Sequence, residues 1–180
     1  MRLVVLLATL LGVAWYAFVV SAKLDERAVL AHYEAQRHAV LSRDPEALCR
    51  LLGSKLQARV QTRMSGITET ATVDKEQACE LLRQQQLFFE DVGDKAGGML
   101  TIEYEQQVRR IDLAANGKSA TVEVVSTLKM GETFMQILST STERLERWLG
   151  RVQVVDMEVQ NRVHWRPGAL ADPQKYFIAR

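Results

Sequence analysis

Apolar and polar residues alternate over most of the stretch between residues 100 and 165, and this period of two constrains the fold more than any other feature. Such alternation is typical of strands that have one face toward a core. Tight turns rich in glycine separate the segments, and short turns join neighbouring antiparallel strands. We therefore expect a four-stranded antiparallel meander. Its strands are predicted at residues 100–113, 119–130, 133–148 and 151–165, with turns at Asn116-Gly117, Gly131-Glu132 and Gly150.

The segment before the meander has helical spacing instead. Apolar residues recur every three or four positions from Leu24 to Leu41, which predicts a first helix. Asp44 is a suitable N-cap for a second helix, since the proline that follows it is tolerated at the first helical position. Leucines at this spacing extend the second helix to Leu56, although Gly53 weakens its middle.

Between this second helix and the meander, the pattern is less regular. Residues 59–64 are predicted to form a short strand, and residues 65–73 are polar without an obvious order. Asp74 is expected to cap a third helix, which ends near the glycines at 93, 97 and 98.

This order of elements resembles the NTF2-like superfamily, which includes nuclear transport factor 2 and ketosteroid isomerase. The resemblance covers roughly Leu24 to Trp165 and is carried by three motifs: RDPEAL, the NGK turn and GRVQVVDMEV. It implies an α+β cone, with about three helices packed on a strongly curved antiparallel meander. Because this fold hosts isomerases, hydrolases, binding pockets and assembly modules, the function must be argued from the site.

The N-terminal segment Leu3–Val20 contains no charged residue. It is long enough for a membrane-spanning helix, but Val20-Ser21-Ala22 also suits signal-peptide cleavage near Ala22. We therefore expect residues 1–22 to be an anchor or a signal peptide, residues 23–165 the domain and residues 166–180 a C-terminal extension. In both cases the domain faces the periplasm, attached to the inner membrane or released from it.

Cys49 and Cys79 are the two cysteines. In an oxidising compartment they can form a disulfide, whereas two buried free thiols are the alternative. Their number and separation do not suggest a metal site, and the spacing of His32, His38 and His164 does not either. We therefore expect no metal and no cofactor.

A pocket at the open end of the cone is implied by the resemblance. Tyr33 and Tyr104 are the candidates to donate hydrogen bonds into this pocket, while Asp112, Asp156 or Glu158 could supply a carboxylate. A core position for Tyr33 and a solvated face for Asp156 are the simpler interpretations.

The segment STSTERLERW is polar on both faces, which is unusual for a buried strand. We interpret it either as an exposed end of the meander or as a polar contact surface. The apolar residues of the C-terminal extension either fold back over the domain or dock on another protein. The interface candidates are Ser139, Ser141, Glu143, Arg144, Tyr176 and Phe177.

The net charge of +1 gives no basic excess for binding nucleic acid. Our first functional hypothesis is a non-enzymatic, membrane-tethered domain that acts as an interaction or assembly component of a bacterial envelope complex. The resemblance implies that the outer face of the sheet contacts a protein partner or a second copy. The alternative is a periplasmic pocket protein, or an isomerase-like enzyme, that binds a small apolar ligand.

Overall fold

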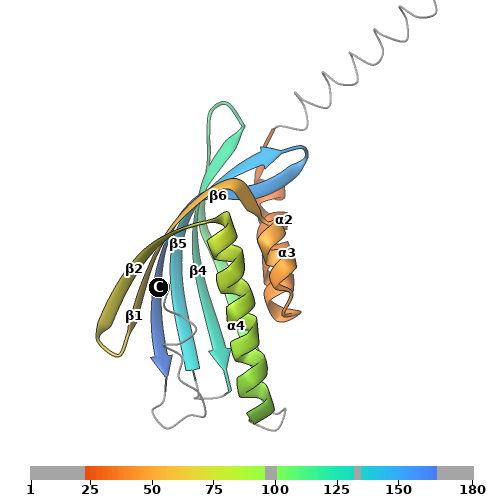
Figure 1. The fold of residues 1–180 in the computed structure, drawn as a ribbon. Coiled ribbons are helices and arrows are strands. Elements are labelled where there is room, and N and C mark those ends of the chain that lie inside the picture. The colour runs from red at the N-terminus through yellow and green to blue at the C-terminus, as the bar shows by residue number, and fades with distance from the viewer. Residues whose placement is uncertain (1–22, 96–100, 132–134, 166–180) are drawn as a thin grey trace, which may run out of the picture.

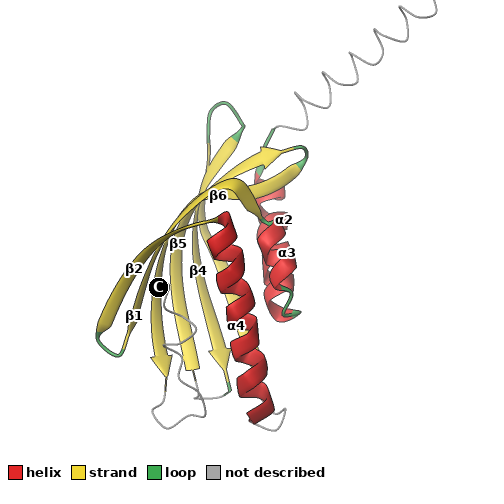
Figure 2. Cartoon of the chain, in the orientation of Figure 1, coloured by secondary structure: helices red, strands yellow, loops and turns green. Residues whose placement is uncertain are grey.

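The computed structural model describes residues 23–95, 101–131 and 135–165 (Figures 1 and 2). Three helices lie together on one side of a curved six-stranded sheet. The elements are α2 (Glu26–Leu41), α3 (Pro45–Arg50), β1 (Leu52–Met64), β2 (Ile67–Asp74), α4 (Lys75–Lys95), β3 (Ile102–Leu113), β4 (Ser119–Met130), β5 (Met135–Trp148) and β6 (Arg151–Trp165).

The strand order is β2-β1-β6-β5-β4-β3. Strands β3 to β6 form the predicted antiparallel meander. Strand β1 pairs with β6 in parallel and with β2 antiparallel, so the sheet is mixed rather than purely antiparallel. The predicted α+β class with helices on a curved sheet is confirmed.

The second helix is shorter than predicted. It ends at Arg50, and Leu52, which we expected in this helix, begins β1. This segment pairs with strand β6 instead, and the pairing begins where the Leu51 carbonyl accepts a hydrogen bond from the Val154 amide at 3.0 Å. Gly53 allows the close approach, since a Cβ atom there would lie 3.0 Å from the Val155 side chain. Pairing with a distant strand therefore overrides the helical spacing of the leucines.

Residues 65–73, for which we predicted no regular structure, form a tight turn and most of β2. Ser65 and Gly66 both have positive φ, at 50° and 86°, as a two-residue hairpin turn of this kind requires. Most of β2 is polar, and Val73 is its buried residue. Because β2 is a mostly polar edge strand, its sequence shows little of the alternation of apolar and polar residues from which the meander was predicted.

The predicted N-caps Asp44 and Asp74 are confirmed, and Asp25 caps the first helix, which begins at Glu26 rather than at Leu24. The side chains of Asp25, Asp44 and Asp74 accept hydrogen bonds from backbone amides three residues later, at 2.7, 2.8 and 2.9 Å. Cys49 and Cys79 lie at disulfide-bonding distance, with their Cα atoms 5.3 Å apart, and connect α3 to α4. This pairing favours the disulfide over two free thiols.

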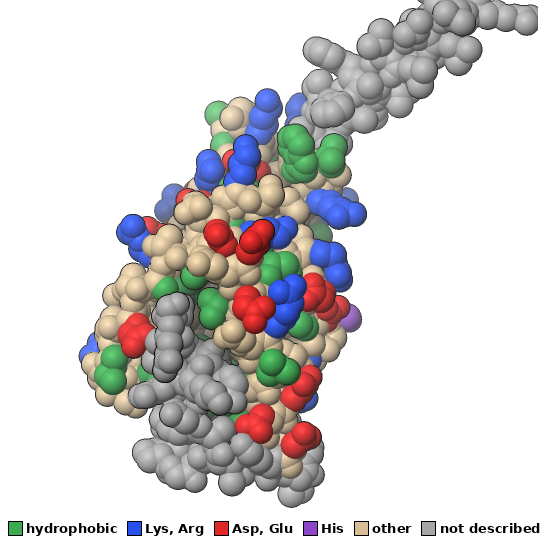
Figure 3. All heavy atoms as spheres, viewed as in Figure 1, with side chains coloured by type: hydrophobic (Ala, Val, Ile, Leu, Met, Phe, Trp, Pro, Cys, Tyr) green, Lys and Arg blue, Asp and Glu red, His purple; other side chains and the backbone are tan. Residues whose placement is uncertain are grey.

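The predicted anchor or signal peptide at residues 1–22 lies outside the described residues, as do the predicted interface residues Tyr176 and Phe177 in the C-terminal extension. Within the described ranges, no helix combines the length and apolar character needed to cross a membrane. Acidic and basic side chains both occur on the face shown in Figure 3. Several form exposed ion pairs, among them Arg83 with Glu46 at 2.7 Å.

Candidate ligand pocket in the cone

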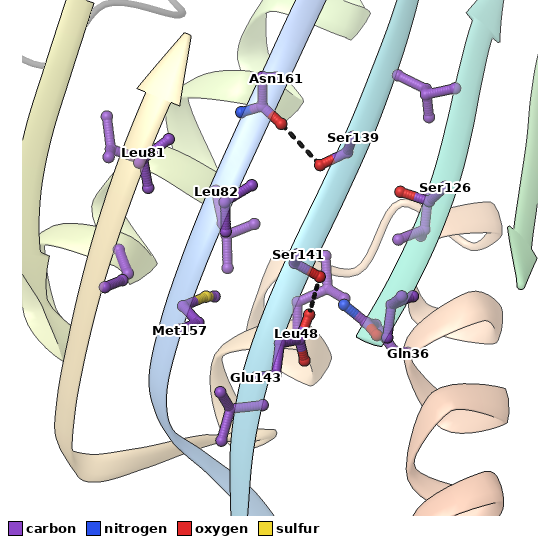
Figure 4. Close-up of a pocket in the computed structure, with 18 of the residues that line it drawn as sticks. Gln36, Leu48, Leu81, Leu82, Ser126, Ser139, Ser141, Glu143, Met157 and Asn161 are labelled. Atoms are coloured by element: carbon purple, nitrogen blue, oxygen red, sulfur yellow. Dashed lines mark hydrogen bonds between the residues drawn. The ribbon is translucent and has the colours of Figure 1, made fainter. Parts of the chain in front are cut away.

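A cavity of about 350 Å³ lies between the helices and the concave face of the sheet (Figure 4). All three helices and all six strands contribute residues to its lining. One wall is apolar and comes from α4, β1 and β6, with Leu81, Leu82, Val60, Met157 and Val159 as its main members. The polar wall is formed by side chains from α2 and from β3 to β5, and two polar residues among the apolar ones of β6 and β1, Asn161 and Thr62, continue it across the sheet.

The polar segment of β5 supplies much of this second wall. Ser139, Ser141 and Glu143 point into the cavity, although the sequence pattern predicts them at an interface. Thr140 and Arg144 alternate with them and are exposed on the outer face. The structure therefore leaves only Arg144, among the described interface candidates, on the outside of the sheet.

Glu143 is a buried carboxyl group held by two hydroxyls. The Tyr33 hydroxyl donates to one carboxyl oxygen at 3.1 Å, and the Ser141 hydroxyl donates to the other at 2.7 Å. Burial raises the pKa of Glu143, and the two hydrogen bonds oppose this rise. No cation contributes to the shift, so Glu143 keeps its proton to higher pH than an exposed glutamate does.

Of the two candidate tyrosines, Tyr104 lines the cavity, whereas Tyr33 is not among its lining residues and is buried beside Glu143. Tyr33 is buried in α2, and burial together with the Glu143 carboxyl raises its pKa. Tyr104 lines the cavity from β3, and burial raises its pKa to about 12 even though Ser126 bonds to its hydroxyl. Both phenols therefore stay protonated at neutral pH and act as hydrogen-bond donors.

His32 lines the cavity from α2, one residue before Tyr33. Its Nδ1 atom lies 3.1 Å from the carbonyl oxygen of Val152, so Nδ1 carries the hydrogen and donates it. Burial lowers the pKa of His32 to about 4, so the ring is neutral at pH 7. His38 and His164 are exposed, and the described part of the chain contains no group of side chains that could hold a metal.

The carboxylates that we considered for the pocket lie elsewhere. Asp112, Asp156 and Glu158 are exposed, and Asp112 forms an ion pair with Arg110 at 2.8 Å. The buried carboxyl is Glu143 instead. The sequence contains a signal for it, because Glu143 has the same strand parity as Leu145 and Ile137, and this parity places it on the face toward the core.

No family model matches the sequence, and no curated protein matches it. Solved structures do match. A conserved protein from Planctomyces limnophilus is 16% identical and has a TM-score of 0.55, over 79% of this chain and 98% of that one. An NTF2-like protein from Cytophaga hutchinsonii is also 16% identical, with a TM-score of 0.50 over 76% and 98% of the two chains. The chain has the NTF2-like fold. A ketosteroid isomerase-like protein from Erwinia carotovora, 12% identical, matches with a TM-score of 0.50 over 75% of this chain and 94% of that one.

At these identities the NTF2-like fold is confirmed, and the function must come from the chemistry of the pocket. The polar wall offers hydroxyl, amide and carboxyl groups, and the pKa values of two of its groups, Glu143 and His32, are shifted toward their uncharged forms. Such a wall can exchange hydrogen bonds with a bound molecule. The apolar wall can bury the rest of that molecule.

Proposed function

We propose that this NTF2-like domain binds a small, largely apolar molecule inside its cone. The cavity of about 350 Å³ is the observation that carries the proposal, because its size is in the range of small-molecule sites. Its lining also has the composition of such sites, with a mostly apolar surface and a few polar groups that fix the orientation of the ligand.

We assign binding rather than catalysis to the pocket. A general base must be available to remove a proton from its substrate. Both oxygen atoms of Glu143 already accept hydrogen bonds, from Tyr33 and Ser141, and burial favours its protonated form. This arrangement supports a group that holds a ligand in place.

A position outside the cytoplasm is part of the proposal. The uncharged segment Leu3–Val20 supports an anchor or a signal peptide. The Cys49–Cys79 pair supports an oxidising compartment, since disulfides are rare in proteins of the cytosol. The role in assembling an envelope complex, and the partner or second copy on the outer face, stay predictions.

A larger side chain inside the cavity should weaken the binding of a small apolar ligand. Leu82 lines the cavity from α4, so Leu82→Trp is expected to lower the affinity for naphthalene at least about tenfold by occupying the space of the ligand. Titration followed by the fluorescence of naphthalene measures this effect. The matched control is Leu87→Trp, an exposed position on the same helix, which should bind like the wild type. Equal affinities for both variants would contradict a site in the cavity.

The N-terminal segment, residues 1–22, leads to a second prediction. If residues 1–22 are an anchor, the full-length mass should be found in the membrane fraction of cells that express the chain. Fractionation followed by intact-mass measurement distinguishes the two forms. A soluble periplasmic form whose mass begins at Lys23 would show that the segment is a cleaved signal peptide.

A further inference from the structure

A row of uncharged polar residues crosses the concave face of the sheet inside the cavity. Each member lies opposite the next in the register of neighbouring strands, from β3 through β4, β5 and β6 to β1. All of them line the cavity. Figure 4 shows three of these side chains next to one another on β4, β5 and β6. We call this set the polar row; its members are Gln106, Ser126, Ser139, Asn161 and Thr62.

The rows on either side are almost wholly apolar. On one side, Leu128, Ile137, Val163 and Met64 accompany a single polar residue, Tyr104. On the other side, four valines accompany a single polar residue, Ser141: Val108, Val124, Val159 and Val60. The polar groups are therefore concentrated in one line that runs across the strands.

The hydrogen bonds within the row leave capacity for a ligand. Ser139 donates to the side-chain oxygen of Asn161 at 2.7 Å, and Gln106 donates to the Gln36 side chain at 2.8 Å. A side-chain amide has two donor hydrogens and an acceptor oxygen, so one bond uses only part of what each amide offers. The bond to Ser139 uses the Asn161 side-chain oxygen, so the two hydrogens of its amide nitrogen are the donors that we assign to a ligand.

The charge of the lining restricts the ligand further. No lysine, arginine or aspartate is among the described residues that line the cavity. A ligand carboxylate or phosphate would be buried without a cation to pair with, and such an unpaired buried charge carries a large desolvation penalty. A ligand ammonium group would meet only Glu143, whose two oxygens are bonded to hydroxyls.

We infer that the ligand is an uncharged molecule that carries two or more hydroxyl, carbonyl or amide groups along one edge and binds with that edge across the strands on the polar row. This inference rests on the proposed function. Neighbouring strands are about 4.8 Å apart, so the polar groups of the ligand are separated by about one or two such spacings. The opposite, apolar edge of the ligand packs on Leu81 and Leu82 of α4.

The test compares two molecules of the same shape with the full-length protein. The probes are 7-hydroxy-2-naphthamide and 7-hydroxy-2-naphthoate, which carry both substituents on the same long edge, followed by their own fluorescence, with naphthalene as the apolar reference. At pH 7 we expect the amide to bind at least about tenfold more tightly than the carboxylate. The difference should narrow toward pH 5, where more of the carboxylate is protonated.

Variants then locate the contact. Asn161→Leu keeps the branched shape of the side chain but removes the amide, and it should weaken binding of the naphthamide about fivefold, the effect of one hydrogen bond, while leaving naphthalene binding intact. The control is Thr140→Ala, an outward-facing position on β5, which should change neither affinity.

The outcomes separate the inference from the proposed function. Carboxylate binding as tight as amide binding, or an unchanged amide affinity in Asn161→Leu, overturns the uncharged ligand and its contact with the polar row. Naphthalene binding without binding of either substituted probe overturns the inference as well and leaves the pocket function standing. If the folded protein binds none of the three probes, the proposed function itself is overturned.

Discussion

Reduction of the Cys49–Cys79 bond is expected to lower the free energy of unfolding by about 3 kcal/mol. The bond joins residues 30 positions apart and links α3 to α4. A cross-link of this span stabilises the protein mainly because it restricts the unfolded chain. Urea unfolding of the full-length protein in detergent, followed by circular dichroism with and without a reductant, measures the loss.

The double variant Cys49→Ala/Cys79→Ala is the control for this experiment. It should unfold at lower urea than the oxidised wild type, and the reductant should not change its midpoint. If the reductant leaves the wild-type midpoint unchanged, the two cysteines do not form a stabilising bond. The argument from the disulfide for an oxidising compartment would then be lost.

Acid is expected to destabilise the fold through His32. The pKa of this residue is lowered from 6.5 to about 4 in the folded state, so the unfolded chain takes up the proton first. Stability from this group is present above pH 6.5 and is lost as the pH falls through about 4. The full loss is about 3 kcal/mol. The effect of Glu143 on stability has the opposite pH dependence. Its pKa is raised in the folded state, so the free energy of unfolding falls as the pH rises.

Two substitutions on α2 isolate this effect. His32→Gln keeps a donor for the Val152 carbonyl and does not titrate, so its stability should fall much less than that of the wild type between pH 6.5 and pH 4. His38→Gln changes an exposed histidine on the same helix and should retain the wild-type acid loss. Urea midpoints across this pH range supply the comparison. Parallel curves for the wild type and His32→Gln would show that His32 is not the group responsible.

The meander could be predicted from sequence because its signals are local. The predicted strands at 119–130 and 151–165 coincide with β4 and β6, since their alternation is strong and glycine turns bound them. The segment from Leu52 to Leu56 could not be predicted in the same way. Its leucines fit a helix by spacing, and the residue that decides for a strand, Val154, lies about a hundred positions later in the chain.

The pocket was harder to predict than the fold. Tyr104 was expected in the pocket and lines it, while Ser139, Ser141 and Glu143 were expected at an interface and line it too. A strand with polar residues on both faces does not show which face is concave. That choice depends on the register of all six strands, which places Ser139 between Ser126 and Asn161.

The position of β6 has a consequence for how the protein is made. The last strand of the described residues, Arg151–Trp165, lies between β5 and β1 in the sheet. Until it is synthesised, the chain holds two separate pieces, a β1–β2 hairpin and a β3–β4–β5 meander, each with an open edge where β6 belongs. Pairing over this sequence distance is slow compared with hairpin formation. A chain that stops before residue 151 therefore lacks the strand that joins the two pieces and that supplies Met157, Val159 and Asn161 to the cavity lining.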